Sequence, residues 1–226
     1  MGKLGIITYN FPHLKTEQVM LRLLPQGRQF KIYALPFTPR KPRETLFAHR
    51  PEQSNAASPV VIAKKHGIPY LLCQADTDIP SECDIYLLLG AGLLSPECVT
   101  DKRIINCHPG IIPSSRGLDS FKWALYEMKP LGVTLHFLDA EVDAGEILSV
   151  VPTVVYEKDT LAALAHRHYE NEIDCLSRFE EFFQKPDNPF AGIAAGEARK
   201  RMPQDKEREM IERFSGYVQK FGVPAA

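Results

Sequence analysis

Short apolar segments alternate with helical ones along most of this chain, and this alternation constrains its fold more than any other feature. Two segments with helical spacing, residues 16–24 and 60–66, lie among the apolar ones. Strands joined through helices form crossover units and parallel sheets. The sequence predicts an α/β fold with a doubly wound, mostly parallel sheet and a ligand site at the carboxyl strand ends. The apolar runs of strand length are residues 3–8, 30–35, 68–72 and 85–89.

The second half of the chain predicts further elements and then a separate extension. Since 226 residues exceed a modal domain but fall short of two, we expect one domain over residues 1–185 and a short C-terminal helical extension over 186–226. The apolar stripe of the last helix either closes over the core or forms a homodimer contact, and we expect the dimer. The predicted elements are helices at 120–128, 160–183 and 203–221, and strands at 131–138 and 150–155.

Charge and hydropathy exclude several classes of protein. The formal net charge is −1, from 27 Lys and Arg against 28 Asp and Glu, which does not favour binding to nucleic acid. No apolar run approaches the roughly 18 residues of a membrane span, and no signal segment opens the chain. We therefore expect a cytoplasmic protein that contacts neither nucleic acid nor membrane.

The five cysteines are an odd number and form no CxxC pair. Most of them stand beside apolar runs, so buried, reduced thiols are favoured over a disulfide framework or a metal site. We expect no metal.

A proline-rich, basic segment, residues 36–58, interrupts the alternation and contains Arg40, Lys41, Arg43 and Arg50. Loops longer than about 12–15 residues in a compact domain are usually functional or disordered. The segment is a candidate for contact with an anionic ligand.

Residues 106–117, NCHPGIIPSSRG, carry the strongest chemical signal. Asn106 and His108 follow an apolar run and stand two residues apart, so both face the same way off a strand end. A second polar cluster, residues 139–145, contains Asp143. An amide can donate to an oxyanion, an imidazole can carry a proton, and a carboxylate can order water, hold the imidazolium or accept a proton. The three side chains are candidate catalytic groups for acyl transfer to an amine.

Each part of this set has an ordinary structural explanation. An isolated Asn-x-His often marks a turn with a surface imidazole, and an isolated Asp-x-Gly is usually a turn. The ordered combination at predicted strand ends of one α/β chain favours the chemical interpretation.

Four stretches together resemble the N10-formyltetrahydrofolate-dependent formyltransferase family. The resemblance is strong over residues 84–156 and extends over 1–83 only in the order of elements. It implies a Rossmann-like formyltransferase fold, with Asn106, His108 and Asp143 as the catalytic triad. The stretches are residues 106–110, 111–117, 132–136 and 142–145.

The resemblance also implies N10-formyltetrahydrofolate as co-substrate, with the pterin held between residues 88–94 and 138–145. Gly90 and Gly92 suit a close approach to backbone, although turn glycines would look the same. His136 matches a strand histidine of the family and is expected in the core rather than in catalysis. The expected folate-binding residues are Leu88, Leu89, Gly90, Leu94, Leu138, Asp139, Glu141 and Val142.

We compare the chain with the branches of this family in turn, to find which branch it resembles most. Glycinamide ribonucleotide formyltransferases resemble one another in a Gly/Ser-rich phosphate turn after the first strand, where this chain has TYNFPH at residues 8–13. Methionyl-tRNA formyltransferases carry a C-terminal RNA-binding barrel, for which the last 41 residues are too few. Formyltetrahydrofolate hydrolases carry a regulatory domain before the catalytic one, and we expect none here. The remaining branch formylates nucleotide-linked amino deoxysugars used in surface polysaccharides such as lipopolysaccharide O-antigen.

Four residues are expected to bind such a nucleotide-sugar. Lys15 and Arg116 suit a pyrophosphate, and Tyr9 and Phe11 suit a base, although each is also explained as a solvated charge or a packing ring. Two other functions stay open, a glycinamide ribonucleotide formyltransferase and a non-catalytic folate- or nucleotide-binding protein. The sequence names neither the sugar nor the nucleotide.

Overall fold

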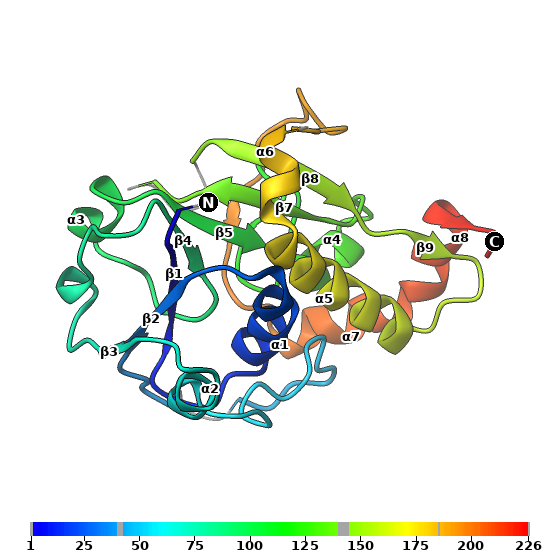
Figure 1. Cartoon of the computed structure of the whole chain (residues 1–226). Helices are drawn as coiled ribbons and strands as arrows, with labels where there is room; N and C mark the ends of the chain where they lie inside the picture. Colours follow the sequence, from blue (N-terminus) through cyan, green and yellow to red (C-terminus); the bar gives the residue numbers. More distant parts are fainter. Residues whose placement is uncertain (1, 40–42, 140–144, 185, 226) are drawn as a thin grey trace.

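A seven-stranded sheet forms the centre of the molecule in a computed structural model that describes residues 2–39, 43–139, 145–184 and 186–225 (Figure 1). Its strands are β1 (Leu4–Tyr9), β2 (Phe30–Leu35), β3 (Tyr70–Leu72), β4 (Ile85–Leu88), β5 (Ile104–His108), β7 (Gly132–Phe137) and β8 (Ile147–Pro152). They lie in the order β3-β2-β1-β4-β5-β7-β8. The first five are parallel, whereas β7 is antiparallel to both β5 and β8. The predicted α/β fold with a mostly parallel sheet is confirmed.

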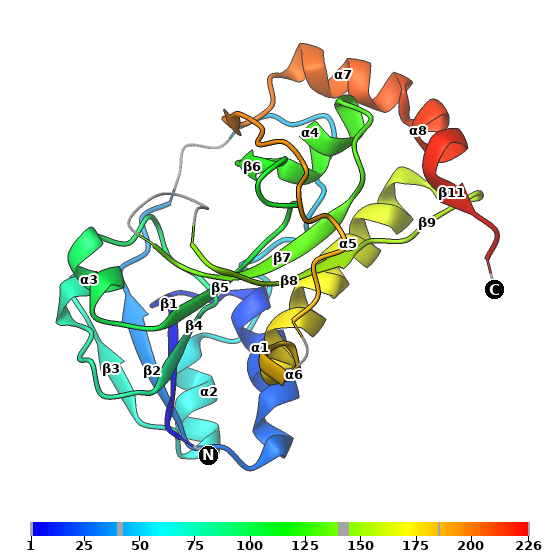
Figure 2. The same cartoon turned by 90° about the horizontal axis from the view of Figure 1, so that it is seen from above.

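Helices cover both faces of this sheet. One face packs against α1 (Leu14–Leu23), α2 (Pro59–His66), α5 (Leu161–Ser177) and α6 (Phe179–Gln184). The 3-10 turn η1 (Leu24–Gln26) extends α1. The other face is covered by α3 (Pro96–Thr100) and by η2 (Asp76–Asp78), the 3-10 turn in the link before β4. Figure 2 shows α1, α2 and α5 on one side of the strands and α3 on the other.

Two of the predicted boundaries were wrong. Asn106 and His108 were expected to follow the apolar run before them, but β5 continues to His108 because β7 pairs with it from Ile105 onward. The strand expected at 150–155 is β8, which begins at Ile147. Ser149 interrupts its apolar pattern, yet this side chain is buried and its Oγ donates to the Asp187 carbonyl at 2.9 Å.

Two long predicted helices are each broken in two. The helix expected at 160–183 ends at Ser177, and the break at Arg178 turns α6 so that Phe179 packs into the core. The helix expected at 203–221 is broken at Arg213 into α7 (Gln204–Glu212) and α8 (Phe214–Phe221). Each helical pattern was read correctly, but tertiary packing set the breaks.

The C-terminal residues fold back onto the body of the protein. Met202, Met210 and Tyr217 share a core cluster with Phe121 of α4 (Ser120–Tyr126) and with Leu164. Two small parallel pairs fasten the same region, β6 (Arg116–Gly117) with β10 (Ala198–Arg199), and β9 (Val155–Tyr156) with β11 (Gly222–Val223). The apolar stripe that suggested a dimer therefore packs largely on its own chain, and the dimer stays a prediction without that support. The division at residue 185 likewise stays a prediction.

All five cysteines are free, and Cys73, Cys98, Cys107 and Cys175 are buried, as expected for reduced thiols. In the part of the chain that the structure describes, no helix combines the length and apolar character that crossing a membrane requires.

Candidate active site

A cavity of about 200 Å³ lies at the carboxyl ends of β1 and β4, beside Asn106 of β5. The sequence predicted six of its lining residues, and the structure brings these six together. They are Tyr9, Lys15, Leu88, Leu89, Gly90 and Asn106, and the cavity is completed by His13, Arg50 and Ala91.

The amide of Asn106 is held in a defined orientation by His136, which is fully buried. The Nδ1 of His136 lies 2.9 Å from the Phe137 carbonyl, and since a carbonyl only accepts, Nδ1 carries the hydrogen. The Nε2 of His136 then accepts from the Asn106 Nδ2 at 3.3 Å. One amide N–H of Asn106 is thereby fixed, and Asn106 also lines the cavity.

His108 is buried, and its Nε2 faces two oxygen atoms. The Ser115 carbonyl lies at 2.8 Å and the Ser120 Oγ at 3.1 Å from this nitrogen. Because Ser120 Oγ donates its own hydrogen to the Gly117 carbonyl, it accepts from His108. Nε2 is therefore a nitrogen that carries a hydrogen.

Gly110 allows this packing around His108. A Cβ at that position would lie 2.6 Å from the Ser115 carbonyl oxygen and 2.9 Å from His108 Nε2. Any larger residue would displace the imidazole or the carbonyl that orients it. This explains in steric terms why glycine follows Pro109 in the NCHPG motif.

A buried carboxylate holds two cations at the cavity wall. Glu172 of α5 is 1% exposed and pairs with Lys15 Nζ at 2.8 Å and with the Arg50 guanidinium. Burial alone would raise the pKa of Glu172, but Arg50 and Lys15 outweigh it and hold this pKa at about 2. Two cations and one carboxylate leave a net positive charge beside the cavity, which suits an anionic ligand.

His13 is a neutral member of the same wall. Burial, with Lys15 and Arg50 nearby, lowers its pKa to about 4. Its Nδ1 lies 2.9 Å from Thr16 Oγ1, and its ring packs so closely on Gly90 that a Cβ there would lie 2.9 Å from the imidazole. The close packing of the His13 ring is therefore by itself a reason for glycine at position 90, whether or not a ligand also approaches there.

The N-terminus of α1 is already occupied by protein groups. The backbone N–H of Leu14 donates to the Gln53 carbonyl at 2.8 Å, and the N–H of Lys15 donates to Gln53 Oε1 at 3.1 Å. Helix N-termini commonly bind phosphate through such N–H groups. Here the long loop, residues 36–58, fills that position with an uncharged glutamine.

The remaining predicted residues lie outside this cavity or outside the described residues. Leu94 and Leu138 pack against the same core cluster as Leu88, and Asp139 is exposed. Phe11 is an exposed ring beyond the cavity lining. Arg116 lies in β6, which pairs with β10, and it is not among the residues that line this cavity, so its expected role in substrate binding stays a prediction. Glu141, Val142 and Asp143 fall outside the described residues.

Sequence reasoning missed His13, Glu172 and Ser120, and gave Arg50 no individual role. Glu172 carried a readable signal, since it occupies the stripe of α5 that contains His168, Tyr169, Ile173 and Leu176. A lone carboxylate on an apolar stripe predicts a buried ion pair. His13, Arg50 and Ser120 had no such local signal.

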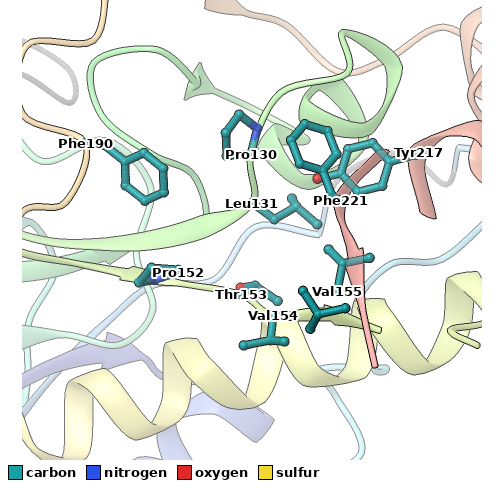
Figure 3. Close-up of a pocket in the computed structure, with 10 residues that line it drawn as sticks. Pro130, Leu131, Pro152, Thr153, Val154, Val155, Phe190, Tyr217 and Phe221 are labelled. Carbon is teal, nitrogen blue, oxygen red and sulfur yellow. The ribbon is translucent and has the colours of Figure 1, made fainter. Parts of the chain in front are cut away.

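A second cavity, of about 330 Å³, lies between the end of β8, β9 and the C-terminal helix α8 (Figure 3). Its walls are mostly aliphatic and aromatic, and its phenol, Tyr217, is buried with the hydroxyl donating to the Lys129 carbonyl at 2.8 Å. It is larger than the cavity at Asn106 but offers no acid or base. Among the described residues, no group of three or more His, Cys, Asp or Glu side chains is placed to hold a metal.

His168 of α5 holds the backbone of the NCHPG segment from the opposite side. Its Nδ1 lies 2.8 Å from Thr153 Oγ1, and its Nε2 lies 3.2 Å from the Pro109 carbonyl, to which it must donate. Burial lowers the pKa of His168 to about 4, Arg50 and His108 act in the same direction, and the Pro109 carbonyl and Glu172 oppose it. The imidazole is therefore neutral at pH 7.

Acid should destabilise the protein through this histidine. The unfolded chain takes up a proton near pH 6.5, whereas folded His168 resists it down to about pH 4. We expect the free energy of unfolding to fall by about 2–3 kcal/mol from this group between about pH 7.5 and 4.5. Urea unfolding of the wild type and of His168→Gln at both pH values measures it. The variant should lose less stability over the interval, and equal losses would contradict the assignment.

A family model described as formyl transferase matches residues 80–179. Formyltetrahydrofolate deformylase 1, mitochondrial, of Arabidopsis thaliana is 30% identical over 128 residues, covering 51% of this chain and 40% of that protein. The chain spans less than half the length of the curated relatives it matches.

Solved structures share the architecture. A sugar N-formyltransferase from Shewanella sp has a TM-score of 0.61 at 16% identity, covering 94% of this chain and 87% of that one. A phosphoribosylglycinamide formyltransferase from Anaplasma phagocytophilum has a TM-score of 0.52 at 25% identity, covering 78% of this chain and 83% of that one. The likeness to the Shewanella protein is one of fold.

Proposed function

We propose that this protein transfers a formyl group from N10-formyltetrahydrofolate to the amino group of a nucleotide-linked amino deoxysugar, because a family model described as formyl transferase matches residues 80–179. The observation that carries the proposal is the cavity that combines the oriented amide of Asn106 with the cationic pair Lys15 and Arg50. The amide of Asn106 suits an acyl oxyanion, and the two cations, Lys15 and Arg50, suit a diphosphate.

The transfer needs a hydrogen-bond donor and a route for one proton. The sugar amine attacks the formyl carbon, a C–N bond forms, and the carbonyl oxygen becomes an oxyanion that the second N–H of Asn106 stabilises. The bond to the folate nitrogen then breaks, the attacking nitrogen loses a proton, and the folate nitrogen gains one. In this proposal His108 carries that proton at Nδ1, and the support is that Ser115 and Ser120 hold Nε2.

The residues proposed for the folate form an apolar wall beside the amide of Asn106. Leu88, Leu89 and Gly90 line the cavity next to Asn106, and Leu138 packs in the same cluster as Leu88. The bound folate would supply the formyl group. Asp143 completes the proposed triad on the strength of its sequence motif.

The choice of acceptor rests on which chemical groups are available to bind its phosphate. A glycinamide ribonucleotide would bring a phosphomonoester, which helix N–H groups bind well, but Gln53 already occupies the N-terminus of α1. Lys15 and Arg50 instead present cationic side chains within the cavity, which suit the diphosphate of a nucleotide-sugar.

An activity assay tests the proposal. The purified protein is incubated with N10-formyltetrahydrofolate and either glycinamide ribonucleotide or amino sugars linked to thymidine, uridine, guanosine or cytidine diphosphate. We expect mass spectrometry to detect a formylated nucleotide-sugar and no formylated ribonucleotide, and Asp143→Ala to abolish the product. Formylation of glycinamide ribonucleotide alone would overturn the proposed acceptor. Binding of both ligands without turnover would favour the non-catalytic alternative.

A further inference from the structure

Two phenylalanine rings are stacked on one another at the surface. The rings of Phe11 and Phe37 have centroids 4.6 Å apart and an interplanar angle of 19°, and each residue is 37% exposed. Tyr9 meets Phe37 edge-on at 5.1 Å and 75°. We call Phe11 and Phe37 the aromatic pair. Two stacked rings that are both partly open to water form a small apolar patch against which a planar ligand can pack.

The aromatic pair lies at the same edge of the sheet as the candidate active site. Phe11 and Phe37 each stand two residues beyond the ends of β1 and β2, which pair in parallel with Tyr9 opposite Leu35. Tyr9 contacts Phe37 and also lines the cavity that contains Asn106. The pair therefore adjoins the cavity through Tyr9.

The groups follow one another in a definite order. Beyond the aromatic pair come Tyr9 and then His13, whose ring centroid is 5.6 Å from that of Tyr9. His13 shares the cavity with the cations Lys15 and Arg50 and with the amide of Asn106. A ligand that used all of these groups would have a planar aromatic end, an anionic middle and a reactive end at the amide.

We infer that the aromatic pair, Phe11 and Phe37, is the platform on which the nucleobase of a nucleoside diphosphate substrate stacks. The inference rests on the proposed function, and to Phe11, which the sequence already suggested for the base, it adds Phe37 as a stacked partner. Stacking on an aromatic ring tolerates every base, because every base has a π face, so the platform fixes the class of ligand rather than its identity. Phe37 is the decisive residue, since it touches both Phe11 and the cavity residue Tyr9.

The pair is assigned to the base and not to the folate ring for a positional reason. The predicted folate residues Leu88, Leu94 and Leu138 gather in a cluster around Cys98 and Ile104, beneath β4 and β5. Phe11 and Phe37 lie instead beyond the ends of β1 and β2, and Phe37 contacts Tyr9, which lines the cavity that contains Lys15 and Arg50.

Equilibrium binding to Phe37→Ala tests the inference. The full chain is titrated by calorimetry with thymidine diphosphate, uridine diphosphate, inorganic pyrophosphate and tetrahydrofolate. We expect the Kd for both nucleoside diphosphates to rise about 10-fold or more, with pyrophosphate and tetrahydrofolate unchanged. Phe37→Trp should restore nucleotide binding, because it restores a ring. Phe190→Ala is the matched control, since Phe190 lines the separate cavity at α8.

The outcomes separate this inference from the proposed function. Nucleoside diphosphates that bind Phe37→Ala as tightly as the wild type would overturn the platform while leaving the acceptor class standing. Loss of tetrahydrofolate binding alone would assign the pair to the folate and also overturn it. A wild-type protein that binds neither nucleoside diphosphate would overturn the nucleotide-sugar acceptor and the platform together.

Discussion

Replacing Asn106 by alanine is expected to lower kcat about 10²–10³-fold, the usual loss when one oxyanion donor is removed. The structural basis is that His136 fixes one N–H of this amide and that Asn106 lines the cavity. The effect should fall on kcat at saturating concentrations of both substrates. Single-turnover measurements of product formation by mass spectrometry would check it.

A shape-matched variant and a remote one complete this test. Asn106→Asp keeps the size of the side chain but has no N–H and adds a negative charge, so it should be at least as impaired as the alanine variant. Asn55→Ala removes an exposed amide from the long loop and should leave kcat unchanged. A kcat within a fewfold of the wild type in both Asn106 variants would refute its role as an oxyanion donor.

Replacing His108 by glutamine is expected to lower kcat about 10²–10⁴-fold, since general acid–base catalysis typically contributes that much. Glutamine keeps a hydrogen-bonding side chain but cannot carry a proton near neutral pH. The wild-type rate should fall on at least one side of neutrality, and the residual rate of the variant should vary less with pH. Steady-state rates from about pH 5 to 9, with folding checked by circular dichroism at each pH, measure this.

Ser120→Ala separates orientation from proton transfer. Its Oγ is one of two acceptors for the Nε2 hydrogen of His108, the Ser115 carbonyl being the other. Loss of one neutral hydrogen bond should lower kcat only about 2- to 10-fold and leave the shape of the pH profile intact.

A flat pH profile of the wild-type rate, with the chemical step limiting, would contradict the proton-carrying role of His108.

The sequence anticipated the architecture because its signals are local. Apolar runs of strand length and helical spacing depend on residues a few positions apart, so β1, β2, β4 and α2 lie close to their expected bounds. The predicted boundaries were wrong where pairing with a strand distant in the sequence set them. An example is β5, which extends to His108 because it pairs with β7. The breaks at Arg178 and Arg213 also depend on what each helix packs against.

The sequence by itself determined the α/β class and the chemical set of Asn106 and His108, because a motif fixes which functional groups stand at one strand end. Only the tertiary structure decided that Lys15 and Arg50 meet at buried Glu172 and that Gln53 closes the N-terminus of α1. These contacts join residues 38 to 157 positions apart in the chain. No local pattern specifies such contacts, since they arise from the packing of α5 against α1 and from the path of the segment that contains Arg50 and Gln53.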